Sequence, residues 1–106
     1  MTPVQLQTNA IPVTNIAVGD TPYSASIGDE VIVVDTDGGD VTVNLHAGVN
    51  GNHKKIINTG TSVLTVIVVP SGTEQIRSGG AGVPFNVEDG LSLDVQFDPS
   101  GGGNWL

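Results

Sequence analysis

Residues that could do chemistry are few in this chain, and they gather in three short segments. Asp35–Asp40, "DTDGGD", holds three carboxylates, His46 and His53 flank the loop "AGVNGN", and Lys54 and Lys55 are adjacent. Three carboxylates close together could bind calcium, and two imidazoles facing each other across a loop could hold zinc. The lysine pair could form a binding site, supply a catalytic group or mark a solvated strand edge.

The spacing argues against a metal in either of the first two segments. An EF-hand loop that starts at Asp35 would need Gly at position 40 and Glu at position 46, where the chain has Asp40 and His46. A β-turn rich in Asp and Gly is therefore favoured. Zinc would need further ligands, but the chain has no third histidine and no carboxylate near the pair in sequence. We expect histidines exposed at loop ends, and no metal or other cofactor.

No pattern indicates an enzyme. "GGAG" lacks the Gly-Lys-Ser/Thr ending of a phosphate-binding loop, and the serines lie in turn contexts rather than in a nucleophile elbow. Glu30, Glu74 and Glu88 could pair with an Asp as in a glycosidase, but nothing in the spacing singles out a pair. We expect a protein without catalytic activity.

The two lysines are expected to act separately. Adjacent side chains on a strand point to opposite faces, so Lys54 and Lys55 cannot hold one ligand together. Two roles remain for them: one lysine protects a strand edge from aggregation, and the other pairs with the acidic surface of a neighbouring copy.

Composition narrows the partners. The 106 residues carry a net charge of −8, which argues against nucleic acid and against anionic membrane surfaces. There is no cysteine, no apolar run of about 18 residues and no signal-peptide pattern, so we expect synthesis without a secretory translocon. Only 38% of the residues are apolar and 4% are aromatic, which suits one small domain that gains stability by self-association.

The elements that must position these residues are strands and turns. Leu91–Phe97 and Val41–Leu45 alternate apolar and polar residues, as strands with one wet face do. Val31–Val34 and Val63–Val69 are apolar on both alternating faces. A strand of that kind needs cover on both sides, from a second sheet or from a neighbouring subunit.

Turn signals separate these strands every 8 to 12 residues or so. This spacing predicts an all-β fold, a small antiparallel β-sandwich or barrel that is jelly-roll-like. Pro3, Pro12 and Pro22 interrupt the start of the chain, where "VTNIAV" offers at most one edge-like strand. We therefore predict an extended N-terminal arm over residues 1–28 and a β-domain over residues 29–106.

A family resemblance appears from about Asp29 to Leu106. The pattern has five parts in this order: a strand ending in Asp-Thr, "VTVNL", "IINTG", a hairpin that ends at "GTEQI" and a terminal strand that ends at "GGGNW". This pattern resembles a small β-domain of tailed-bacteriophage structural proteins, which occurs in tail fibres, receptor-binding proteins and capsid decoration proteins, typically as trimers. It carries no catalytic residues. The chain begins at Met1 and ends soon after the module, so we expect a stand-alone virion protein rather than part of a long fibre.

The resemblance implies a capsid decoration (cement) protein, made in the host cytoplasm and bound as a homotrimer to the major capsid protein on the virion surface. The alternative is a tail-fibre or receptor-binding module that recognises host-surface glycans. The expected trimer interface is Val31, Val33, Val63, Ile67 and Val69, and the expected capsid-contacting arm residues are Val4, Leu6, Ile11, Val13 and Ile16. In the alternative, Tyr23 and Trp105 would stack on sugars.

Overall fold

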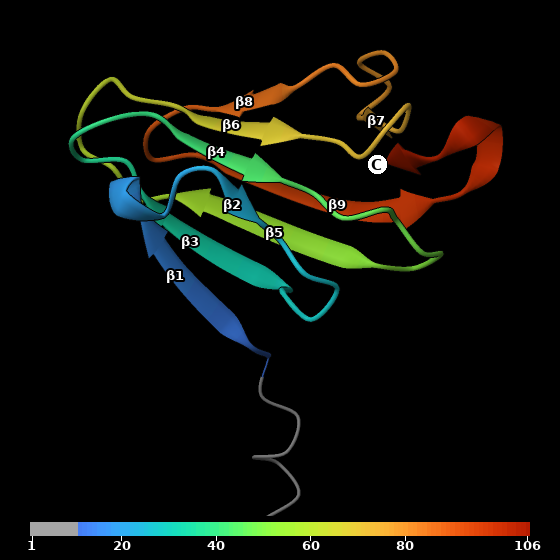
Figure 1. Cartoon of the computed structure of the whole chain (residues 1–106), viewed down its shortest axis with the longest axis horizontal. Coiled ribbons are helices and arrows are strands. Elements are labelled where there is room, and N and C mark those ends of the chain that lie inside the picture. The colour runs from blue at the N-terminus through green and yellow to red at the C-terminus, as the bar shows by residue number, and fades with distance from the viewer. Residues whose placement is uncertain (1–10) are drawn as a thin grey trace, which may run out of the picture.

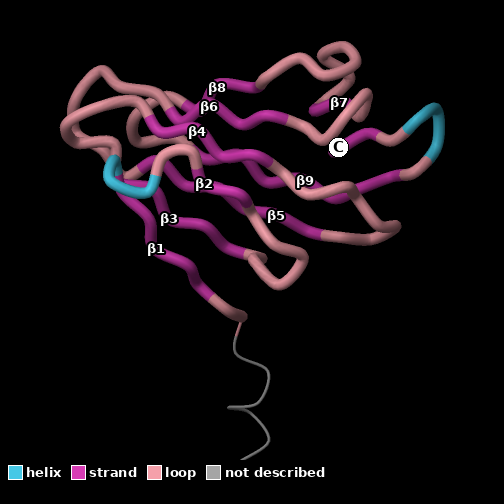
Figure 2. The backbone as a smooth tube through the Cα atoms, viewed as in Figure 1, coloured by secondary structure: helices cyan, strands magenta, loops and turns pink. Residues whose placement is uncertain are grey.

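Two β-sheets pack face to face in the computed structural model, which describes residues 11–106 (Figure 1). The six-stranded sheet runs in the order β1 (Val13–Ala17), β3 (Val31–Asp35), β5 (His53–Asn58), β9 (Ser92–Asp98), β10 (Asn104–Trp105) and β7 (Gln75–Ile76). The four-stranded sheet runs β2 (Tyr23–Ser24), β4 (Val41–Asn44), β6 (Val66–Val69) and β8 (Phe85–Val87). Two short 3-10 turns, Val18–Asp20 and Ser100–Gly102, lie at the ends of the sheets (Figure 2). The predicted all-β class is confirmed.

The prediction of an antiparallel, jelly-roll-like arrangement is wrong for most of the strand pairs. From β1 to β6 the chain alternates between the two sheets, so neighbouring strands within a sheet run parallel: β1 with β3, β3 with β5, β2 with β4, and β4 with β6. Antiparallel pairing occurs where β8 joins β6, β9 joins β5, and β10 joins β9. The turns carry the chain across to the opposite sheet, and turn residues alone do not specify which sheet the next strand joins.

The core lies between the sheets and is built by period-two alternation. In β9, Leu93, Val95 and Phe97 are buried while the residues between them are exposed, as the sequence predicts. In the other sheet, Val41 and Val43 of β4 are fully buried. Burying one such side chain contributes about 1.5 to 3 kcal/mol, so the facing rows of valine, isoleucine and leucine supply most of the stabilisation.

The first described strand belongs to the sheets rather than to a separate arm. β1 pairs with β3 from Val13 beside Val31 to Ala17 beside Asp35, and Ile16 is only 6% exposed in the core. The expected edge strand is therefore present, but the predicted arm through residue 28 does not hold for β1 and β2. Burying Ile16 favours sheet pairing over an extended arm.

Candidate functional site

Lys54 is the most deeply buried charged group of residues 11–106, and it is held by backbone carbonyls. Its side chain is 1% exposed, and Nζ donates hydrogen bonds to the carbonyl oxygens of Ser26, at 2.9 Å, and Asp29. Lys55, the next residue, points out of the sheet and is half-buried. The predicted separation of the two lysines onto opposite faces is confirmed. The predicted edge role is wrong, because β5 lies between β3 and β9.

The carboxylate of Asp29 completes this cluster. It accepts hydrogen bonds from Thr14 Oγ1 at 2.8 Å, from the Tyr23 hydroxyl at 2.7 Å and from the Ser26 backbone N–H at 2.9 Å. These donors come from β1, from β2 and from the loop before β3, while Lys54 comes from β5. We call these five residues the Asp29–Lys54 cluster. It ties the start of the chain to the centre of the six-stranded sheet.

The cluster shifts the pKa of each of its three titratable groups. Burial raises the pKa of Asp29, but the hydrogen bonds from Ser26, Tyr23 and Thr14 outweigh it, and the net pKa lies below its usual value. Burial lowers the pKa of Lys54, and attraction to Asp29 and Glu30 offsets part of that shift. The hydrogen bond to Asp29, followed by burial, raises the pKa of Tyr23 to about 12.

Alkaline pH should weaken the fold through Tyr23. Its pKa is raised on folding, so its contribution to stability is complete below about pH 10, the unfolded value, and is lost as the pH rises toward 12. Lys54 has the opposite effect on stability, because its pKa is lowered on folding. Its contribution rises with pH over the interval just below 10.5, the usual pKa of a lysine. Replacing Tyr23 with Phe should cost about 1.5 kcal/mol at pH 7. In urea titrations between pH 10 and 12, the variant should also lack the decrease in the free energy of unfolding that ionisation of Tyr23 causes.

Absorbance of the phenolate gives a direct check of this prediction, because Tyr23 is the single tyrosine of the chain. The folded protein should ionise near pH 12 and the urea-unfolded protein near pH 10. Equal midpoints in the two states would contradict the hydrogen bond to Asp29.

A second buried polar network joins the ends of β3 and β5. Asn58, 1% exposed, accepts hydrogen bonds at Oδ1 from Thr36 Oγ1 at 2.8 Å and from the Gly60 N–H at 3.0 Å. Its Nδ2 donates to the carbonyls of Leu64 at 3.1 Å and Val87 at 3.0 Å. A Cβ on Gly60 would lie 2.0 Å from Thr36 Oγ1, so no other residue fits. Thr36 of the Asp-Thr element and Asn58 and Gly60 of "IINTG", which belong to the family resemblance, are therefore joined in one hydrogen-bond network.

The carboxylates of "DTDGGD" cap loops instead of converging on one point. Asp37 Oδ1 accepts from the Thr61 N–H at 2.9 Å, and Asp40 Oδ1 accepts from the Thr65 N–H at 2.8 Å. Asp35 Oδ1 accepts from the Asp37 N–H at 2.9 Å. The segment is the predicted turn between β3 and β4. Within residues 11–106, no three His, Asp or Glu side chains are grouped so that they could hold a metal ion.

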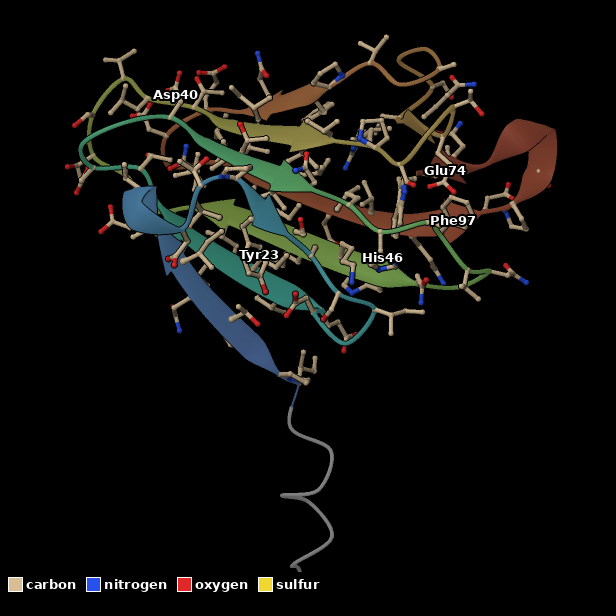
Figure 3. The ribbon with its side chains drawn as sticks, in the orientation of Figure 1. Tyr23, Asp40, His46, Glu74 and Phe97 are labelled. Atoms are coloured by element: carbon tan, nitrogen blue, oxygen red, sulfur yellow. The ribbon has the colours of Figure 1, made fainter. Side chains whose placement is uncertain are left out.

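The two histidines have different surroundings. His46 Nδ1 donates to the Ala47 carbonyl at 2.7 Å, and its ring meets Trp105 edge-on at 5.7 Å (His46 is labelled in Figure 3). His53 lies on the outer face of β5, with Nδ1 3.6 Å from Glu30 and Nε2 2.5 Å from Asp94. The carboxylates approach opposite nitrogens, so a metal on one nitrogen would meet only one of them.

Neither aromatic residue proposed for sugar stacking presents an open ring. Trp105 is fully buried and packs against Phe97 at a ring distance of 5.0 Å, so the prediction that it stacks on a ligand is wrong. Tyr23 is half-buried and packs against the core, with its hydroxyl engaged by Asp29. An indole at the end of a small sandwich buries more apolar area in the core than it would on the surface.

The expected interface valines do not form one surface. Val31 and Val33 point out of the six-stranded sheet, whereas Ile67 and Val69 point out of the four-stranded sheet; all four are half-buried. Val63 lies in the loop between β5 and β6 and is 91% exposed. An interface can use one of these faces, but not both at one contact.

The expected arm residues also divide. Ile11 and Val13 are more than half exposed and can contact a partner. Ile16 belongs to the core, so the expectation that it contacts the capsid is wrong. Val4 and Leu6 lie outside the described residues.

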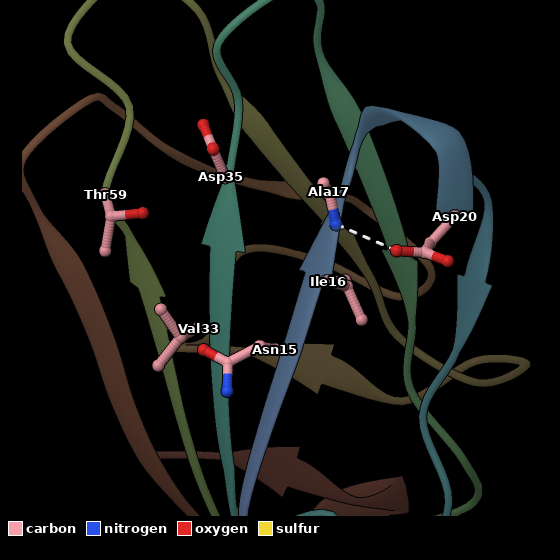
Figure 4. A pocket seen from close by; sticks show the side chains of 7 residues that line it. All are labelled: Asn15, Ile16, Ala17, Asp20, Val33, Asp35 and Thr59. Carbon is pink, nitrogen blue, oxygen red and sulfur yellow. Dashed lines mark hydrogen bonds between the residues drawn. The ribbon is translucent and has the colours of Figure 1, made fainter.

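A shallow pocket of about 400 Å³ opens at the ends of β1 and β3 (Figure 4). Val33 and Ile16 supply apolar lining, and Asn15 and Thr59 add polar side chains. Asp20 and Asp35 also line it. The sequence did not predict this site. Asp20 reaches the pocket because the 3-10 turn after β1 brings it beside the sheet, and no sequence pattern indicated that turn.

Comparison with protein-family models, with curated proteins and with solved structures finds no match to this chain. Among residues 11–106, no helix has the length and apolar character needed to cross a membrane.

Proposed function

We propose that this protein is a phage capsid decoration protein, which binds the outer surface of the major capsid protein as a homotrimer and stabilises the assembled shell. The observation that carries the proposal is that Val31 and Val33, and on the opposite sheet Ile67 and Val69, point away from the core and are only half-buried within the chain. Apolar side chains in the middle of an outer sheet face favour a contact with another chain.

The use of the polar residues supports the same proposal. Asp29, Lys54, Asn58 and the "DTDGGD" carboxylates hydrogen-bond to groups of their own chain, and so build a rigid two-layer body. A decoration protein needs such a body, since it acts by binding the assembled shell and shifting the assembly equilibrium by mass action. Many weak contacts related by symmetry would add through avidity.

The glycan-binding alternative is weaker, because Trp105 is buried and Tyr23 is tied to Asp29. Copy number separates the two functions. Mixed with undecorated phage capsids, the protein should bind in hundreds of copies per particle and raise the temperature at which the shell disassembles. Binding limited to a few dozen copies at the tail would favour the fibre module, and no binding would overturn the capsid proposal.

The truncation that tests the arm must end before β1. Deletion of residues 1–21 would remove β1 and the core residue Ile16, so it should unfold the sandwich rather than release the capsid alone. Deletion of residues 1–10 keeps every described contact. If the arm holds the capsid through Val4 and Leu6, this shorter protein should keep its melting temperature and its native mass but lose capsid binding. Full capsid binding would place the anchor elsewhere.

A further inference from the structure

The outer face of the six-stranded sheet carries an apolar patch next to a single cation. Strand register places Val13 beside Val31 and Val31 beside Lys55, with Val33 beside Ile57 in the next outward row. We call Val13, Val31, Val33 and Ile57 the outer apolar patch. Val13 is more than half exposed, and the other three are half-buried.

The acidic pocket lies on the same face, at the other end of the strands. Val33 belongs both to the patch and to the pocket lining, so the two surfaces are continuous. Asp20 Oδ2 accepts the Ala17 N–H at 2.9 Å and Asp35 Oδ1 accepts the Asp37 N–H at 2.9 Å, which fixes both carboxylates (Figure 4 shows the first bond). Each keeps a second oxygen that can accept a hydrogen bond from a cation.

Lys55 is the natural complement of this pocket, but its own chain does not bring the two together. Of the three cations in the sequence, Lys54 is buried and Arg77 donates to the Asp94 carbonyl, at 3.0 Å. Lys55 pairs in register with Val31, and Asp35 lies four residues further along β3, roughly 13 Å away at 3.3 Å per residue. No salt bridge forms at Lys55 within residues 11–106.

The carboxylate opposite Lys55 across the strands is bonded to a histidine instead. Asp94 lies directly opposite Lys55 in the register of β5 and β9, and its Oδ1 is bonded to His53 Nε2 at 2.5 Å, while no salt bridge joins it to Lys55 within the described residues. A second copy of the chain can supply what the first lacks, because each copy carries both the cation and the pocket on one face.

We propose that the outer face of the six-stranded sheet is the surface between copies of this chain, with Lys55 of one copy seated between Asp20 and Asp35 of the next. The inference rests on the homotrimer of the proposed function and selects this face over the four-stranded one. The lysine stem packs on the apolar lining at Val33 while the ammonium meets the two carboxylates. The outer apolar patch is covered at the centre of the contact. In a chain of net charge −8, this pairing also offsets the repulsion between copies.

Reversing the charges one at a time and then together tests this contact. Lys55→Asp and Asp35→Lys, made singly, should each weaken self-association at least tenfold, measured by native mass spectrometry and sedimentation over a dilution series. The double variant should recover most of the association, because the charges again match in opposite positions. Association of the parent protein should also weaken as salt is raised.

Matched controls separate this contact from a general charge effect. Arg77→Asp makes the same change in net charge as Lys55→Asp, at a cation outside the outer apolar patch and the pocket, and should leave association unchanged. Asp35→Lys removes a hydrogen bond of the turn after β3, so a second variant is needed that leaves this turn intact. Val33→Asp changes an outward-facing position of β3 and should also weaken association. Circular dichroism and melting curves establish that each variant is folded.

The outcomes distinguish this inference from the proposed function. An oligomer that does not respond to Lys55→Asp or Val33→Asp would overturn the interface while leaving the decoration role intact. Charge-dependent oligomers that do not bind capsids would support the interface and overturn the decoration role. A monomer at every concentration would overturn both the interface and the trimer.

Discussion

Replacing Asp29 with alanine is expected to destabilise the fold by about 3 to 5 kcal/mol, a large share of the stability of a small domain. The substitution removes the attraction of the Asp29 carboxylate for the Lys54 ammonium, which is almost fully buried, and it removes the acceptor of three hydrogen bonds. Urea denaturation of the parent and the variant at pH 7 measures the difference.

A double-mutant cycle shows how much of this loss arises from charge. Lys54→Met replaces the ammonium with an apolar side chain of similar length, so Asp29→Ala should cost at least 1 kcal/mol less in that background. Asp98→Ala serves as the matched control, because Asp98 accepts one backbone N–H in an exposed turn outside the proposed contact between copies. A cost for Asp29→Ala no larger than that for Asp98→Ala would refute the role given to the cluster.

Asn58→Ala is expected to destabilise the protein by about 3 to 5 kcal/mol through a different mechanism. The variant leaves the Thr36 hydroxyl, the Gly60 N–H and the carbonyls of Leu64 and Val87 without their partner in a buried space, and it opens a cavity. The melting temperature should fall by about 10 °C or more in calorimetry.

Asn86→Ala gives a matched control on β8, where an exposed asparagine faces away from the core. That variant should change the free energy of unfolding by less than about 0.5 kcal/mol. Similar losses for the two asparagines would show that the Asn58 network does not hold β3 and β5 together.

Alternation in the sequence predicted most of the inward positions, but Leu91, which it placed on the inward face, is 59% exposed and lies just before β9. Val41 and Val43 in β4 and Leu93, Val95 and Phe97 in β9 are buried as their period of two requires. The parallel pairing was not predictable in the same way. A run such as "DTDGGD" marks a turn whether the chain returns along the same sheet or crosses to the other one, and only the packing of the whole chain decides between these paths.

The polar part of the structure was the least predictable. Lys54 can be buried because its Nζ donates hydrogen bonds to the carbonyl oxygens of Ser26 and Asp29. These two residues lie far from Lys54 in the sequence, so no local spacing indicates the contact. Asn58 was visible only as part of a motif, without the Thr36 partner that explains it. The strand rule did place Lys54 and Lys55 on opposite faces, but it could not say that one face was the core.

The order of the strands also determines how the protein responds to mechanical load. β1 is an outer strand hydrogen-bonded to β3 alone, whereas β9 is hydrogen-bonded on both sides, to β5 and to β10. Tension applied at residue 11 therefore acts first on β1, which pairs with β3 alone. Tension applied at Leu106 acts first on β10, which is held between β9 and β7. Attachment through the N-terminal side therefore loads an outer strand first, and attachment through the C-terminal side first loads a strand that is paired on both sides.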